Sequence, residues 1–142
     1  MTETTFDDVL NRLNSSTPAR KLAALIERTN LSADMKALLA DLAKITVKVG
    51  KAVVAIGRSV LKFVFELVKA FPNITLGVLI ALVLATIVGA LPLIGAILTP
   101  ILTPLLLAVG IGKGALADMA KGDLGEKISN LTKDFKVVED NL

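Results

Sequence analysis

The residues of this chain that could do chemistry form a row of basic side chains in its middle third. Between residues 44 and 69 the chain carries six basic groups and one acidic group, Glu66, a net charge of +5. The basic residues are Lys44, Lys48, Lys51, Arg58, Lys62 and Lys69. Their chemistry is electrostatic, because Lys and Arg near a membrane surface are attracted to anionic lipid headgroups. We therefore predict lipid-headgroup contacts at these six positions.

Other kinds of chemistry are excluded by composition. The 142 residues include no His, Cys, Trp or Tyr. A Ser-His-Asp triad, a thiolate nucleophile and a zinc site with the usual nitrogen and sulfur ligands are therefore impossible. An aromatic platform for stacking single-stranded nucleic acid is not expected either. We predict a protein that is not an enzyme, holds no metal or cofactor and binds no nucleic acid, although a row of Lys and Arg can neutralise phosphates.

The spacing of the basic row predicts the element that carries it. The seven charged residues follow one another at intervals of 4, 3, 7, 4, 4 and 3, which places them on one stripe of an α-helix. Nearly all other residues of segment 44–71 are apolar or Gly, so the opposite arc is wide. We interpret 44–71 as a basic amphipathic helix that buries this arc in a lipid interface or against other copies of the chain. The apolar spacing extends it N-terminally into one helix of residues 33–71.

The next segment, residues 70–112, contains no ionisable side chain over 43 consecutive positions. A transmembrane helix needs about 20 apolar residues, so the run fits two helices joined by a tight turn. Pro92 and Gly95 mark that turn, between arms at residues 73–91 and 96–112. These arms would reach roughly 28 and 26 Å, which allows a full crossing or a deep hairpin in one leaflet. A hairpin buried in a soluble helical bundle is the alternative, although so short a chain has little else to cover it.

Small residues recur every four positions along both arms. The helix-packing positions predicted from this repeat are Gly77, Ala81, Ala85, Gly89, Ala96 and Ala108, with Pro100 and Pro104 between the last two as kinks. Helices in lipid associate through close backbone approach over small residues. The repeat therefore packs one arm against the other or against a neighbouring copy.

The flanks of the uncharged run predict its orientation. Lys62 and Lys69 precede it, and Lys113 and Lys121 follow it. Because cytoplasmic loops carry the excess of Lys and Arg, we expect a membrane location with both termini in the cytoplasm. The first residues are polar and acidic, so we expect no cleaved secretory signal.

The proline pattern of the second arm invites a comparison with known proteins. The stretch from Pro92 through Pro100 to Pro104 resembles the proline knot of oleosins, plant lipid-droplet proteins whose uncharged hairpin enters a phospholipid monolayer. This resemblance implies a hairpin that anchors and coats. In its size and small number of spans the chain is also similar to phage holins, which implies oligomers that open a hole in a membrane.

These observations together predict an all-α membrane protein with four parts. Residues 1–43 form a cap of short helices with Thr5, Thr17 and Ser32 as N-caps, and residues 44–71 form the basic amphipathic helix. Residues 72–112 form the hydrophobic hairpin, and residues 113–142 form a hinge, a short helix and a tail. The expected function is to anchor to, coat or shape an anionic membrane as a homo-oligomer. The alternative is a pore-forming or holin-like oligomer that permeabilises it.

Overall fold

The computed structural model describes residues 6–14 and 18–142, with the backbone alone for Lys113 and Ala117. Within these residues the chain forms eight helices and one pair of short strands. In order they are α1 (Phe6–Asn14), α2 (Ala19–Glu27), α3 (Ala33–Ala43), β1 (Val47–Val49), β2 (Ala52–Val54), α4 (Ile56–Ala70), α5 (Leu76–Ala90), α6 (Pro92–Val109), α7 (Lys113–Met119) and α8 (Gly122–Asp140). The mainly helical fold is confirmed, and the prediction of helices alone is wrong.

The N-caps predicted for the first helices can be compared with the structure at one position. The hydroxyl of Ser32 accepts a hydrogen bond from the Met35 N–H at 3.2 Å, so Ser32 is the N-cap of α3 as predicted. Thr5 and Thr17 lie outside the described residues.

The largest departure from the prediction is in the middle of the expected long helix. The chain leaves the helix after Ala43, forms the antiparallel hairpin of β1 and β2, and becomes helical again at Ile56. Four of the nine residues from 46 to 54 are Val and one is Thr, and these branched side chains favour strands. Gly50 has a φ of +61° at the first position of the two-residue turn, where a type II′ hairpin turn needs it. The single helix of residues 33–71 is therefore wrong.

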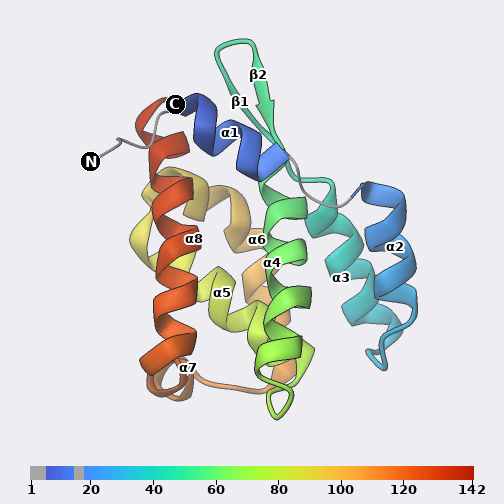
Figure 1. Cartoon of the computed structure of the whole chain (residues 1–142). Helices are drawn as coiled ribbons and strands as arrows, with labels where there is room; N and C mark the ends of the chain where they lie inside the picture. Colours follow the sequence, from blue (N-terminus) through green and yellow to red (C-terminus); the bar gives the residue numbers. More distant parts are fainter. Residues whose placement is uncertain (1–5, 15–17) are drawn as a thin grey trace.

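The β-hairpin is attached to the helices by one side chain. The Asn14 amide donates a hydrogen bond to the carbonyl of Val53 at 3.0 Å and accepts one from the Ala55 N–H at 3.1 Å. The Asn14 side chain thus pairs with backbone groups at the base of the hairpin as a neighbouring strand would. The tip of the hairpin projects from the molecule (Figure 1). At the start of α4, Gly57 lies so close to the Leu42 carbonyl that a side chain there would collide with it.

The helices surround α5. It contacts α4, α6, α7 and α8, while α1 crosses the top of the bundle and packs on α4 and α8. Helices α2 and α3 lie side by side at the opposite edge from α8 (Figure 1). An ion pair joins α1 to α8, since Arg12 donates to the Asp134 carboxylate at 2.7 Å. This hydrogen bond raises the pKa of Arg12 above its usual value.

The two arms of the predicted hairpin are α5 and α6, which pack against each other along their length. The turn consists of Leu91 and Pro92, the first residue of α6, whose missing N–H costs nothing at a helix start. A Cβ on Gly95 would lie 2.9 Å from the Val88 backbone, so the absence of a side chain lets the two arms approach.

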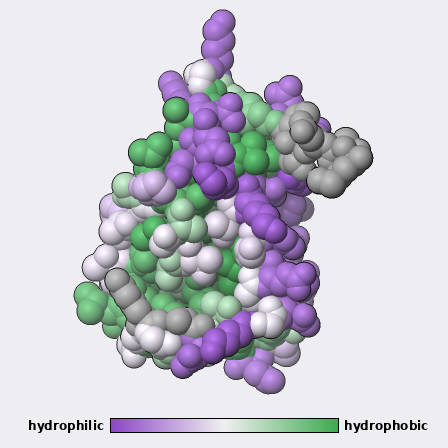
Figure 2. Space-filling view, turned by 90° about the vertical axis from the view of Figure 1, so that its left-hand side faces the viewer, coloured by the Kyte–Doolittle hydropathy of each residue, from purple (hydrophilic) through white to green (hydrophobic). Residues whose placement is uncertain are grey.

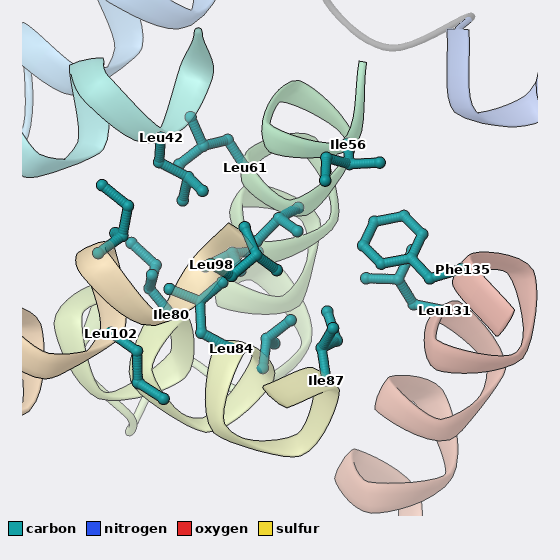
Figure 3. Packing of buried hydrophobic residues seen from close by; sticks show 14 of the residues in the cluster. Leu42, Ile56, Leu61, Ile80, Leu84, Ile87, Leu98, Leu102, Leu131 and Phe135 are labelled. Carbon is teal, nitrogen blue, oxygen red and sulfur yellow. The ribbon is translucent and has the colours of Figure 1, made fainter. Parts of the chain in front are cut away.

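The core is one continuous cluster that extends from α1 to α8 and has α5 at its centre. Figure 3 shows Ile80, Leu84 and Ile87 of α5 between side chains from helices on either side of it. From one side Leu42 of α3 and Leu61 of α4 approach, and from the other Leu131 and Phe135 of α8. The wide apolar arc of α4 is thus used inside the molecule, since Ile56, Val60, Leu61, Val64 and Leu67 are buried.

Candidate functional site

The most unusual surface of the molecule is the outer side of α6, which we call the α6 face. Its exposed residues include Leu93, Ala96, Ile97, Pro100, Leu107 and Ala108. Leu107 is 80% exposed and Leu93 54%, unusually high fractions for leucines in a long apolar helix. No ionisable residue lies in α6, so only Thr99 and Thr103 add polar groups to this side. Helix α6 therefore presents an apolar side that no other described helix covers.

Helix α6 is also the one helix of the described chain that is long and apolar enough to cross a membrane. It has 18 residues, and 33% of them are buried inside the protein. At 1.5 Å per residue it would reach about 27 Å, close to the thickness of the hydrocarbon core. Helix α5 has 15 residues and is shorter than a typical span. Length and composition therefore distinguish the two arms.

The small residues of the two arms have different surroundings. Gly77 and Ala81 are buried, and a side chain on Gly77 would touch Met35 of α3 and Val109 of α6. Ala96 and Ala108 are exposed on the α6 face, so they do not pack α6 against α5. Their other predicted use, contact with a neighbouring copy, stays a prediction.

Ala85 and Gly89 line a cavity of about 340 Å³ between α5, α6 and α7. Its wall is apolar apart from Thr86, whose hydroxyl donates to the Leu82 carbonyl at 2.9 Å. The small residues therefore leave open space beside the hairpin. On the side of the molecule in Figure 2, hydrophobic and weakly polar residues cover the middle and lower left, while hydrophilic residues gather at the top, along the right edge and along the bottom.

The prolines of the hairpin lie where the sequence predicts them, but the helix continues through them. Pro92 begins α6, and Pro100 and Pro104 lie inside it. They remove the N–H groups that would bond the carbonyls of Ala96 and Pro100. The Thr99 hydroxyl donates at 2.7 Å to the carbonyl of Gly95, the residue that precedes Ala96.

The N-terminus of α6 is held by a residue that lies far along the chain. The Glu139 carboxylate, 9% exposed, accepts hydrogen bonds from the Leu93 and Ile94 N–H groups at 2.9 and 2.7 Å. A carboxylate at this end of a helix also interacts favourably with the helix dipole. Glu139 of α8 therefore caps α6 across the bundle. Local sequence patterns do not indicate this contact, because α7 and most of α8 lie between α6 and Glu139 in the chain.

The six basic residues do not form one helical stripe, contrary to the prediction. Lys44 caps the C-terminus of α3, and Lys48 and Lys51 are exposed on the β-hairpin. Arg58, Lys62 and Lys69 lie on α4. Lys62 and Lys69 line a shallow groove with Leu22 and Leu25 of α2. The first three cations lie at the end of α3 and on the β-hairpin, and the last three lie on α4, so the positive charge is spread over one end of the molecule and one side of α4.

Comparison with protein-family models, curated proteins and solved structures found no match for this chain.

Two features of the site were foreseeable and two were not. The uncharged hairpin and its turn follow from hydropathy and from Pro92. The exposure of one arm and the burial of the other depend on which helices cover them. The cap from Glu139 depends on the same packing. The alternation of apolar and polar residues in Val47, Lys48 and Val49 is typical of a strand. The spacing of the Lys residues, however, fits a helix equally well.

Proposed function

We propose that this protein is a non-enzymatic membrane protein that anchors to and coats an anionic membrane through its hydrophobic hairpin, with α6 as the arm that contacts lipid. The α6 face carries the proposal, because it is an exposed apolar helix surface without an ionisable residue. Transfer of a Leu or Ile side chain from water to an apolar phase is worth roughly 1.5–3 kcal/mol. Leu93, Ile97 and Leu107 together would supply several kcal/mol on entering lipid. The resemblance of the proline pattern to oleosin hairpins supports the same role.

The basic residues would add an electrostatic contribution to membrane binding. Lys48 and Lys51 are exposed on the projecting β-hairpin, where each would add about 1 kcal/mol of attraction to an anionic bilayer. With lysines before and after the uncharged run, both termini would remain on the cytoplasmic side. Ala96 and Ala108 on the α6 face would allow close contact between neighbouring copies in the membrane.

Vesicle flotation tests the apolar part of this proposal. The variant L93Q/L107Q replaces the two most exposed leucines of the α6 face, and the control A37Q/L142Q replaces two exposed apolar residues that lie outside both the α6 face and the β-hairpin. We expect the partition coefficient of L93Q/L107Q to fall at least tenfold while the control stays within twofold of the unmodified protein. Equal losses in the two variants, with both still folded by circular dichroism, would exclude the α6 face as the membrane contact.

The electrostatic part has its own control. K48Q/K51Q removes two cations of the β-hairpin, and K127Q/K133Q removes two exposed cations of α8. On vesicles containing an anionic phospholipid we expect binding by the first variant to fall about thirtyfold, with little change for the second. On vesicles of phosphatidylcholine alone the two variants should bind alike. Loss of binding by both variants to the same degree would indicate general attraction of a basic protein.

A permeabilising function is the second candidate, and the burial of α5 favours it. Helix α5 is uncharged yet enclosed by α4, α6 and α8, so it could reach lipid only if the bundle opened. Such an opening is typical of proteins that insert a buried hairpin to form a pore. Release of a trapped dye at low protein-to-lipid ratio would support this candidate over the coat, whereas membrane tubulation without release would support the coat.

A further inference from the structure

The groove between α2 and α3 lies apart from the hairpin and has a different chemical character. It is open to solvent and has a volume of about 390 Å³, within the range of small-molecule sites in proteins. Its apolar lining comes from both helices: Ala19, Ala23, Ile26, Ala40 and Ala43. Four charged residues complete the wall: Arg20 and Glu27 from α2, and Lys36 and Lys44 from α3 and its C-terminal cap.

The charges are divided between the two ends of this groove. Helices α2 and α3 run in opposite directions (Figure 1), so Arg20 near the start of α2 shares one end with Lys44 after the end of α3. Glu27 and Lys36 share the other end, where the Lys36 ammonium donates to the Glu27 carbonyl at 3.0 Å. Among the described residues neither Arg20 nor Lys44 has an ion-pair partner. The charged residues that line one end are thus both cations, while at the other end the charges of Glu27 and Lys36 offset each other.

We propose that this groove binds a long-chain carboxylate, that is, the anion of a single-chain fatty acid. The carboxylate lies at Arg20 and Lys44, and the chain runs along Ala23 and Ala40 toward Glu27. The complementarity of charge orients the ligand in this direction. Helix α2 rises about 12 Å from Ala19 to Glu27, the length of about ten methylene groups in an extended chain. A ligand with a second chain or a bulky headgroup would exceed this space.

Calorimetric titration with a series of free fatty acids, below the concentration at which they form micelles, tests the chain contact. Each added methylene should tighten binding about fourfold up to roughly ten carbons, after which the affinity levels off. A23L fills the groove, while A24L puts the same side chain on the exposed neighbouring position. Both substitutions keep a strong helix former. Decanoate binding should be lost in A23L and retained in A24L, and equal affinities in the two variants would overturn the proposal.

A second pair of variants tests the carboxylate contact. R20Q/K44Q should bind decanoate about tenfold more weakly than the unmodified protein, and K21Q, which removes a cation outside the groove, should not. Decanol should bind the unmodified protein and R20Q/K44Q equally. Decanol that binds the unmodified protein as tightly as decanoate would show that the cations do not contact the ligand and would overturn the orientation.

This site is separate from the proposed membrane contact, and the two can fail independently. L93Q/L107Q should bind decanoate normally, because neither residue lies in the groove. If A23L instead lost flotation on vesicles and the unmodified protein bound no fatty acid, the groove would be a contact with the bilayer itself, and the proposal would be wrong.

Discussion

Helices α5 and α6 are both apolar and uncharged, and they are adjacent in the chain, yet they are buried to different extents. Eight of the 15 residues of α5 are buried, including five consecutive ones from Ile80 to Leu84. Six of the 18 residues of α6 are buried, and its outer side is exposed along its whole length. The two helices differ in their neighbours, because α4 and α8 cover the sides of α5 that do not contact α6. Hydrophobic composition therefore identifies the pair as a unit but does not show which helix faces outward.

The largest test of this contrast compares one leucine from each arm. Leu84 of α5 is fully buried, and Leu107 of α6 is 80% exposed. We expect Leu84→Ala to lower the free energy of unfolding by about 2–5 kcal/mol, because it removes core contacts and leaves a cavity. Leu107→Ala should change it by less than about 0.5 kcal/mol. Urea unfolding followed by circular dichroism measures both, and similar losses would mean that α6 is covered as α5 is.

The second test concerns how each arm is capped. Thr75, next to α5 in the chain, accepts a hydrogen bond from the Val78 N–H at 3.4 Å, whereas α6 depends on the distant Glu139. We expect Glu139→Ala to cost about 1.5–3 kcal/mol, because it leaves the Leu93 and Ile94 N–H groups without the charged acceptor.

Amide hydrogen exchange gives this second test its specific readout. Exchange at Leu93 and Ile94 should accelerate in the Glu139→Ala variant more than exchange at Val78 does. Asp140→Ala is the control, since Asp140 pairs with Lys136 on the surface and does not touch α6. A comparable effect of this control would show that α8 stabilises α6 by packing alone.

The third test uses glycines from the two arms. In Gly95→Ala the new methyl group would lie 2.9 Å from the Val88 backbone, and separating the arms should cost about 1–3 kcal/mol. A Cβ on Gly89 of α5 meets nothing within 4 Å. Gly89→Ala should therefore raise the stability by about 0.5–1 kcal/mol, the usual gain from replacing Gly inside a helix. Thermal unfolding measures both, and a destabilising Gly89→Ala would show that the cavity is closed in solution.

The smallest effect is expected at the surface of the helices that cover α5. Arg12→Gln removes the ion pair with Asp134, whose side chains are 50% and 25% exposed, and should cost about 0.2–1 kcal/mol. Since the pKa of Arg12 is raised, this contribution is present at neutral pH and is lost only as the pH rises through that pKa, far into the alkaline range. Urea unfolding at low and high salt checks it, because high salt should reduce the difference between the two proteins.

Some of the fold could be predicted because local signals agreed with each other. The uncharged run, its interruption at Pro92 and the Ser32 cap each have a local physical cause, and the structure contains all three. The long helix of residues 33–71 could not be excluded in this way. The intervals between Lys44, Lys48 and Lys51 satisfy a helical period, while the branched side chains between them favour strands, and the closing of the hairpin against Asn14 decided the outcome.

By itself, the sequence determined the absence of thiol and imidazole chemistry, the position of the uncharged hairpin and the small residues along it, because these depend on residue type and spacing alone. Only the tertiary structure decided that α4 turns its apolar arc inward, that α5 is enclosed, and that α6 presents Leu93 and Leu107 outward. The physical reason is that the burial of a side chain depends on the elements that pack around it. Transfer of an apolar side chain from water to any apolar environment lowers the free energy. The packing of helices that are distant in the chain determines which side chains are buried inside the protein.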